Sequence, residues 1–159
     1  MKIWNEMIDG FIREANKNNV RMIMVGGGAV NFHGYQRNSA HVDFWLDTES
    51  ENLKNLVKAF QNIGYEIEDF PETVKNQEQN ISIKFSPADL NLELITKFSV
   101  NKTFDEAFKD AEKVTINKSP VLKWRVLSYN DLVTSKLKAA RPKDLLDIQE
   151  LKRIKGNKN

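Results

Sequence analysis

The residues of this chain that could do chemistry begin with a run of three glycines at 26–28 and continue in an alternating stretch at 41–46. The glycines follow a short apolar run, and a backbone without side chains can approach a ligand closely and direct its amide groups at an anion such as phosphate. In a strand, His41 and Asp43 lie on one face, where two side chains at this spacing can bind one cation. Together these residues indicate a site for a phosphate group and a divalent metal.

A third candidate ligand is Glu93, which lies within the apolar stretch 90–96 and needs a partner there. Taken singly, His41, Asp43 and Glu93 are better explained as satisfied polar residues on a solvated strand edge, and the glycines as a tight turn without a ligand. The glycines match neither a Walker A loop nor a complete dinucleotide-binding fingerprint. The combination of all these residues is what favours a site.

Hydrophobic patterns predict the elements that must hold these residues. A strand at 20–25 leads into the glycine turn, a short helix at 29–35 follows it, and a strand at 41–46 bears His41 and Asp43. The other predicted elements are a helix up to 18–19, a helix closed by Gly64, a strand starting at 65–67, an antiparallel pair at 80–85 and 90–96, a helix at 104–111, a hairpin of 113–116 and 121–127, a helix at 129–140 after a Ser128 and Asp131 capping pattern, and a last helix from Pro142.

Composition limits the class of protein. The length of 159 residues, with 40% hydrophobic residues, favours a single domain over 1–159 with 128–155 as a short helical lobe. The chain has no cysteine, so a metal must be bound by oxygen or imidazole ligands. We find no apolar run long enough to cross a membrane and no secretion signal, and we expect a cytoplasmic protein. The net charge of +2 is too small to predict binding to duplex DNA.

The order of these residues resembles the nucleotidyltransferase superfamily, especially its small stand-alone bacterial members, over nearly the whole chain from Val20 to about Ile154. The stretch 25–37 is similar to the family's Gly-Gly turn and following helix, and 92–96 is similar to the strand with the third carboxylate. The other positions that carry the resemblance are Arg37, Ser39, His41 and Asp43, which fall where the family has Arg, Thr and an Asp-x-Asp pair, the segment 104–107, and the C-terminal residues Asp131, Leu132, Lys136, 141–145, Asp147 and Ile148.

The resemblance implies an α+β fold of the nucleotidyltransferase type, with a mixed sheet flanked by helices and a short C-terminal helical lobe. It also implies a nucleoside triphosphate as substrate and Mg²⁺ or Mn²⁺ as cofactor. The residues to which it assigns roles are Asp43, Glu93 and Lys136 in catalysis, His41, Asp43 and Glu93 in metal binding, and Gly26, Gly27, Arg37, Ser39 and Arg141 in binding the triphosphate.

Two residues depart from the family pattern, because His41 replaces the first Asp of the pair and Glu93 is longer than the usual third acid. A neutral imidazole brings one nitrogen donor and no negative charge, whereas Mg²⁺ prefers oxygen ligands. Affinity for a second metal ion should therefore fall, which leaves Mn²⁺ or a single-ion mechanism open.

Other polar residues are weaker candidates for the site. His33 is expected to be a structural hydrogen-bonding residue rather than a catalytic one. Asp144 and Asp147 lie near the start of the last helix, where they would complement its dipole. Asp47 and Asp89 are reserve metal ligands.

Two hypotheses of function follow. The first is an enzyme that transfers a nucleoside monophosphate from a nucleoside triphosphate to a hydroxyl of an RNA, a protein or a small molecule. The second, motivated by His41, is a catalytically silent relative that binds a nucleotide or a partner through the same cleft, for example in a toxin–antitoxin system.

Overall fold

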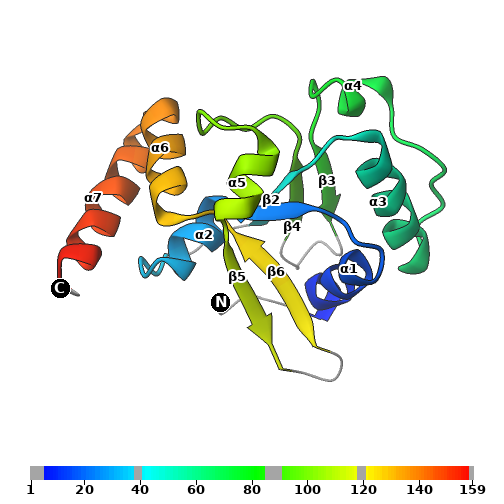
Figure 1. Ribbon diagram of the computed structural model, residues 1–159, viewed down its shortest axis with the longest axis horizontal. Helices are drawn as coiled ribbons and strands as arrows, with labels where there is room; N and C mark the ends of the chain where they lie inside the picture. Colours follow the sequence, from blue (N-terminus) through cyan, green and yellow to red (C-terminus); the bar gives the residue numbers. More distant parts are fainter. Residues whose placement is uncertain (1–5, 38–40, 85–90, 118–120, 158–159) are drawn as a thin grey trace.

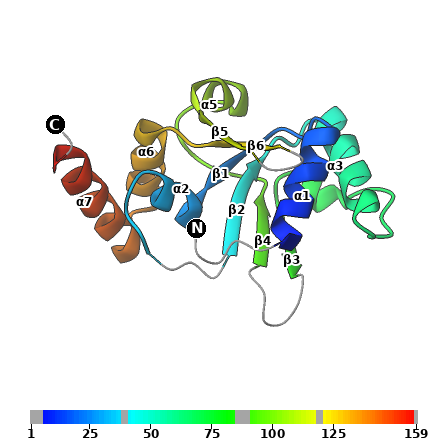
Figure 2. The same cartoon turned by 90° about the horizontal axis from the view of Figure 1, so that it is seen from below.

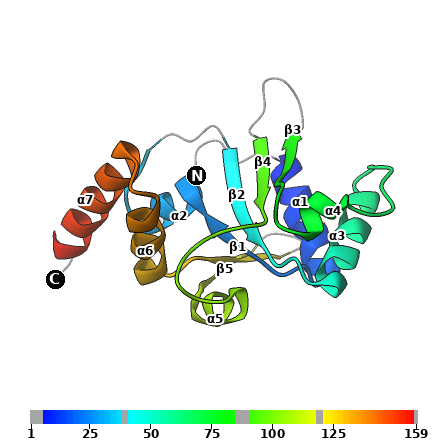
Figure 3. The same cartoon turned by 90° about the horizontal axis from the view of Figure 1, so that it is seen from above.

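The computed structural model of the chain describes residues 6–37, 41–84, 91–117 and 121–157 (Figure 1). Within these ranges, six strands form one mixed sheet in the order β3-β4-β2-β1-β6-β5. In Figures 2 and 3 the sheet lies between α1 and α3 on one side and α2, α6 and α7 on the other. The predicted α+β class with a mixed sheet and C-terminal helices is confirmed.

The central strands of the sheet carry the predicted site residues. β2 (His41–Leu46) is antiparallel to β1 (Met22–Val25) and parallel to β4 (Asn91–Ile95), so it has neighbours on both edges. On one edge of the sheet, β3 (Ile81–Lys84) is antiparallel to β4. On the other edge, β5 (Glu112–Ile116) and β6 (Leu122–Val126) form an antiparallel hairpin, and β6 is parallel to β1. Both antiparallel pairs were predicted from the sequence.

Seven helices connect and cover these strands within the described residues. They are α1 (Glu6–Lys17), α2 (Gly26–Phe32), α3 (Ser50–Asn62), α4 (Glu72–Lys75), α5 (Phe104–Asp110), α6 (Tyr129–Ala139) and α7 (Pro142–Asn157). Among the described residues, no helix combines the length and the apolar character that a membrane crossing requires.

Alternation along β2 directs its side chains to the two faces of the sheet. Phe44 is fully buried in the same apolar cluster as Phe11 of α1 and Phe60 of α3, whose ring centroids are 5.6 Å apart. Trp45 is on the other face, where it packs against Phe98 and Phe104 with centroid distances of 5.2 and 5.1 Å. Asp43 shares the face of Trp45, because side chains two residues apart point the same way.

Local capping explains where the later helices begin. The Ser128 hydroxyl accepts a hydrogen bond from the Asp131 amide at 3.1 Å, as the sequence predicts for the start of α6. Thr103 and Glu106 form a complete capping box at the start of α5, in addition to the predicted one at Ser128. Pro142 is the first residue of α7, where its missing amide costs no hydrogen bond.

The structure differs from the sequence-based predictions in three segments. The helix after β1 begins at Gly26 rather than Ala29, so the glycines form its first turn. Residues 65–67 form no strand, because the Tyr65 amide donates to Phe60 O and the Gln61 side chain donates to Ile67 O, which ties this segment to α3. The short helix α4 was not predicted.

Candidate active site

The first glycine and Asp43 are in direct contact. In the β1–β2 ladder Val25 lies opposite Asp43, and the chain then turns at Gly26 with a φ of 61°. A Cβ at Gly26 would overlap with Oδ2 of Asp43, so only glycine lets the backbone pass this close to the carboxylate. The glycine turn and Asp43, which the sequence predicts to act together, therefore form one surface.

The second carboxylate lies beside Asp43 on the neighbouring strand. In the parallel ladder of β2 and β4, Asp43 is in register with Glu93 and His41 with Asn91. Residues in register on adjacent strands have their side chains on the same face. The negative charge of Glu93 also contributes to raising the pKa of Asp43, so the two carboxylates interact electrostatically.

His41 lies against the same carboxylate, with its Nδ1 atom 2.5 Å from Oδ1 of Asp43. Burial raises the pKa of Asp43 above its ordinary value, whereas the charges and hydrogen bond of His41 and the charge of Lys136 oppose this shift. A buried carboxylate with a raised pKa beside a second acid favours a cation in its vicinity.

The donor set fits one divalent ion better than two. Among the described residues, no three His, Asp or Glu side chains are grouped closely enough to form a ready metal site. Two neighbouring carboxylates nevertheless match the way Mg²⁺ is often bound, through one or two carboxylates with phosphate oxygens and water supplying the other ligands. Asp43 and Glu93 could hold such an ion once a triphosphate is present.

Three basic residues predicted to belong to the site gather around two buried aspartates. Lys136 of α6 is buried, with its Nζ atom 2.9 Å from Oδ2 of Asp147 and 3.3 Å from Oδ1 of Asp144. Arg37 reaches Asp147 from the segment after α2, with Nε 3.0 Å from Oδ1. Arg141 is 2.6 Å from Asp144 through its Nε atom. We refer to Arg37, Lys136, Arg141, Asp144 and Asp147 as the basic cluster.

Lys136 links the basic cluster to Asp43, because its positive charge opposes the rise in the pKa of this carboxylate that burial causes. The basic cluster holds three cations and two carboxylates, which leaves one positive charge in excess. An excess of positive charge beside two carboxylates suits a polyanion that also brings a metal ion.

Asp144 and Asp147 have a different role from the one expected. Instead of simply complementing the dipole of α7, both are buried and bind the three basic side chains. Burial tends to raise the pKa of Asp144, but hydrogen bonds from Arg141 and the charge of Lys136 together hold it below its ordinary value. A buried carboxylate needs such partners, which the i, i+3 spacing in the sequence does not reveal.

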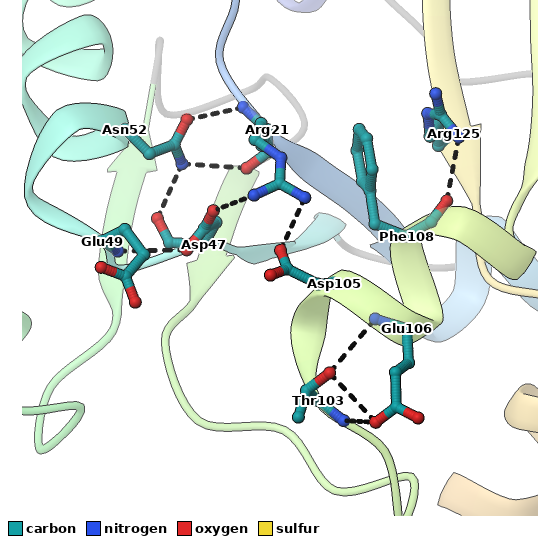
Figure 4. A network of polar contacts seen from close by, with 9 residues as sticks. All are labelled: Arg21, Asp47, Glu49, Asn52, Thr103, Asp105, Glu106, Phe108 and Arg125. Atoms are coloured by element: carbon teal, nitrogen blue, oxygen red, sulfur yellow. Dashed lines mark hydrogen bonds and ion pairs between the residues drawn. The ribbon is translucent and has the colours of Figure 1, made fainter.

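His33 and Asp47, which were weaker candidates for the site, both have structural contacts. The ring of His33 bonds through Nε2 to the carbonyl oxygen of Leu127 at 2.8 Å, as expected for a structural histidine. Asp47 lies just beyond the other end of β2 and binds Arg21 at 2.8 Å, in the network of Figure 4. Asp47 is therefore too far along the strand to serve as a reserve ligand beside Asp43.

The remaining predicted residues are Gly27, which is buried in the first turn of α2, and Ser39 and Asp89, which lie outside the described residues. One contact was missed from the sequence: the hydroxyl of Ser82 on β3 donates to Oε1 of Glu93 at 2.6 Å. The alternation of the segment 80–85 places Ser82 on one face, but only the register of β3 against β4 reveals its partner.

Comparison with known families agrees with this arrangement. The family model described as "Nucleotidyltransferase of unknown function (DUF6036)" matches residues 6–156, which includes both carboxylates, the glycine turn and the basic cluster. No curated protein matches the chain significantly. Since the match extends over nearly all of the sequence, the chain belongs to this family of nucleotidyltransferases.

Proposed function

We propose that this protein transfers a nucleoside monophosphate from a nucleoside triphosphate to a hydroxyl group, in a reaction that depends on Mg²⁺ or Mn²⁺. The observation that carries the proposal is the contact of the Asp43 carboxylate with the Gly26 backbone, beside Glu93 in register on the next strand. A site for a triphosphate and its metal ion needs accessible backbone amides for the phosphates and, next to them, carboxylates for the ion.

Each group has a role that its chemistry supports. Asp43 and Glu93 would hold the metal ion, which His41 could join as a third ligand only by leaving its contact with Asp43. The ion would neutralise charge on the triphosphate as pyrophosphate leaves. Backbone amides at Gly26 and Gly27 would orient phosphate oxygens, since the first amides of a helix have no partner within the helix. The side chains that would bind the triphosphate are the basic groups of Lys136, Arg37 and Arg141 and the hydroxyl of Ser39.

The contact of His41 with Asp43 favours a mechanism with one resident ion. A nitrogen donor that already lies against Oδ1 of Asp43 supplies no negative charge for a second ion. Mn²⁺ accepts imidazole more readily than Mg²⁺ does, so we expect Mn²⁺ to support transfer at lower concentration than Mg²⁺.

The proposal places the protein in the cytoplasm, as one domain, with an RNA, a protein or a small molecule as acceptor. To test it, purified protein is incubated with each of the four α-labelled nucleoside triphosphates, Mg²⁺ or Mn²⁺, and cell extract. Label should move to one class of acceptor, and Asp43→Asn should reduce transfer about 1,000-fold, since it removes a charge that acts in the reaction. Asp69→Asn, a change of the same chemistry at an exposed site paired with Lys75, should keep full activity.

A second candidate function rests on the same histidine. Because His41 occupies the position of a carboxylate and contacts Asp43, the protein is alternatively a silent relative that binds a nucleotide or a partner, for instance in a toxin–antitoxin pair. His41→Asp separates the two functions. A wild-type chain without transfer that becomes active as His41→Asp supports the silent relative, whereas transfer by the wild-type chain excludes it.

A further inference from the structure

Ser82 lies directly opposite Glu93 across the antiparallel ladder of β3 and β4. Its Oγ atom donates a hydrogen bond of 2.6 Å to Oε1 of Glu93, and Glu93 is in turn in register with Asp43 on β2. The three side chains therefore form one row across three strands, and Ser82 is its outer member.

The contact is not explained by packing. Ser82 is exposed, and β3 pairs only with β4 among the described strands, so the serine buries little surface. Serine is not among the residue types enriched in strands, where β-branched and aromatic residues are favoured. The hydroxyl is thus the part of Ser82 that interacts with the site.

Glu93 needs such a partner more than Asp43 does. Its side chain has one more torsion than that of an aspartate and is only half-buried, so without a partner its carboxylate would sample several positions. It also lies beside a second acid, because it is in register with Asp43 on β2. A hydroxyl that donates to one oxygen restricts the rotation of the carboxylate.

We propose that Ser82 is a positioning residue for the metal site, which holds Oε1 of Glu93 so that the remaining lone pairs of this carboxylate can bind the ion shared with Asp43. The inference rests on the proposed function, in which Glu93 is a metal ligand. Mutation of groups that orient metal ligands in this way typically lowers metal affinity or activity by about 10- to 100-fold.

The test measures binding of Mn²⁺ alone to the full chain, from the electron paramagnetic resonance signal of the free ion. Ser82→Ala should weaken binding about tenfold, at the lower end of the range for residues that orient metal ligands. Ser82→Thr keeps the hydroxyl and should bind within about twofold of wild type, and Ser99→Ala, a control at another exposed serine, should not change binding. In the transfer assay, Ser82→Ala should raise the half-saturating Mn²⁺ concentration and largely keep the rate at saturation.

Glu93→Gln distinguishes the two ways in which the inference can fail. If Glu93→Gln weakens Mn²⁺ binding but Ser82→Ala binds like wild type, the positioning role is wrong and the proposed metal site stands. If Glu93→Gln itself leaves binding unchanged, Glu93 is no ligand, and both the metal site as proposed and the role of Ser82 are overturned. Loss of binding in Ser82→Thr as well as in Ser82→Ala would also contradict the role of the hydroxyl.

Discussion

At the scale of single residues, the site combines groups whose charges depend on one another. The Asp43 carboxylate is buried beside Glu93, and the Lys136 ammonium is buried between Asp144 and Asp147. Burial of a charge costs free energy unless opposite charges or hydrogen bonds compensate for it. The residues of the site should therefore respond in a coupled way when one charge is removed.

Lys136→Met tests whether the buried ammonium binds the triphosphate. The change keeps most of the length of the side chain but removes a positive charge that acts on Asp43, so we expect nucleotide affinity to fall about tenfold or more. The measurement is equilibrium binding of labelled nucleoside triphosphate with Mn²⁺. Lys138→Met, on the same helix but exposed, is the control and should bind as wild type. Equal affinity in the two variants would contradict a role for Lys136.

Asp144→Asn should destabilise the protein in a manner that depends on pH. The folded-state pKa of Asp144 lies below its unfolded value, so its stabilisation is complete above the unfolded pKa and is lost as pH falls through the folded pKa. At pH 7 the variant should lose about 2 kcal/mol of unfolding free energy, as is usual for hydrogen bonds to charged groups.

Urea denaturation of both proteins between pH 7 and pH 3 measures this dependence. The difference between wild type and Asp144→Asn should be largest near neutral pH and should shrink below about pH 4, the unfolded value of an aspartate. Glu68→Gln, at an exposed position, serves as the control for a general effect of charge. A difference that grows on acidification would show that the charge of Asp144 is not stabilising.

At the scale of elements, the junction of β1 and α2 determines the geometry around Asp43. The strand ends at Val25, and Gly26 starts the helix with a positive φ while its backbone touches the carboxylate on the antiparallel neighbour. Strand, turn and helix therefore meet without space for a side chain.

Gly26→Ala should damage both stability and function. The left-handed conformation costs a residue with a Cβ about 1–2 kcal/mol, and the new methyl group must displace the Asp43 carboxylate, so we expect a total loss of about 3 kcal/mol. Gly10→Ala is the matched control. A Cβ at Gly10 meets no atom within 4 Å, and alanine in the helix α1 should stabilise the protein by about 0.5–1 kcal/mol. Thermal denaturation of both variants, together with the transfer assay, measures these effects.

At the scale of the whole molecule, a network beyond the far end of β2 ties the sheet to the helices (Figure 4). The guanidinium of Arg21 binds Asp47 at 2.8 Å and Asp105 of α5 at 2.7 Å, and it lies over the rings of Phe104 and Phe108. The Asn52 side chain of α3 bonds to both the amide and the carbonyl of Arg21. Three segments distant in the sequence are joined there without a contribution from the site residues.

Arg21→Ala should therefore lower stability and leave the chemistry of the site intact. Loss of the charged hydrogen bonds and ring contacts of a partly exposed arginine should cost about 1–2 kcal/mol. Hydrogen exchange should speed up most in α5, which Arg21 holds through Asp105 and the phenylalanine rings. Arg153→Ala, which removes an exposed pair with Glu150, is the control and should change stability by less than about 0.5 kcal/mol.

Much of the fold could be predicted because local spacing decides local structure. The bounds of β2, the two antiparallel pairs and the starts of α6 and α7 agree with the alternation, the turn residues and the capping signals of the sequence. Residues 65–67 were wrongly predicted as a strand, because their backbone groups bond to α3 and such a choice between partners depends on packing. The chemical types of the candidate site residues and their order along the chain could also be predicted from the sequence, as could the resemblance to nucleotidyltransferases.

Only the tertiary structure decided which of these residues meet. Register places Glu93 beside Asp43 and Ser82 beside Glu93, and Arg37 binds Asp147 across 110 positions of the chain. Helix and strand periods follow from residues a few positions apart, so the sequence by itself determined the elements, the faces and the chemical types. Strand register and buried ion pairs depend on which distant segments become neighbours when the core packs, and no local pattern contains that information.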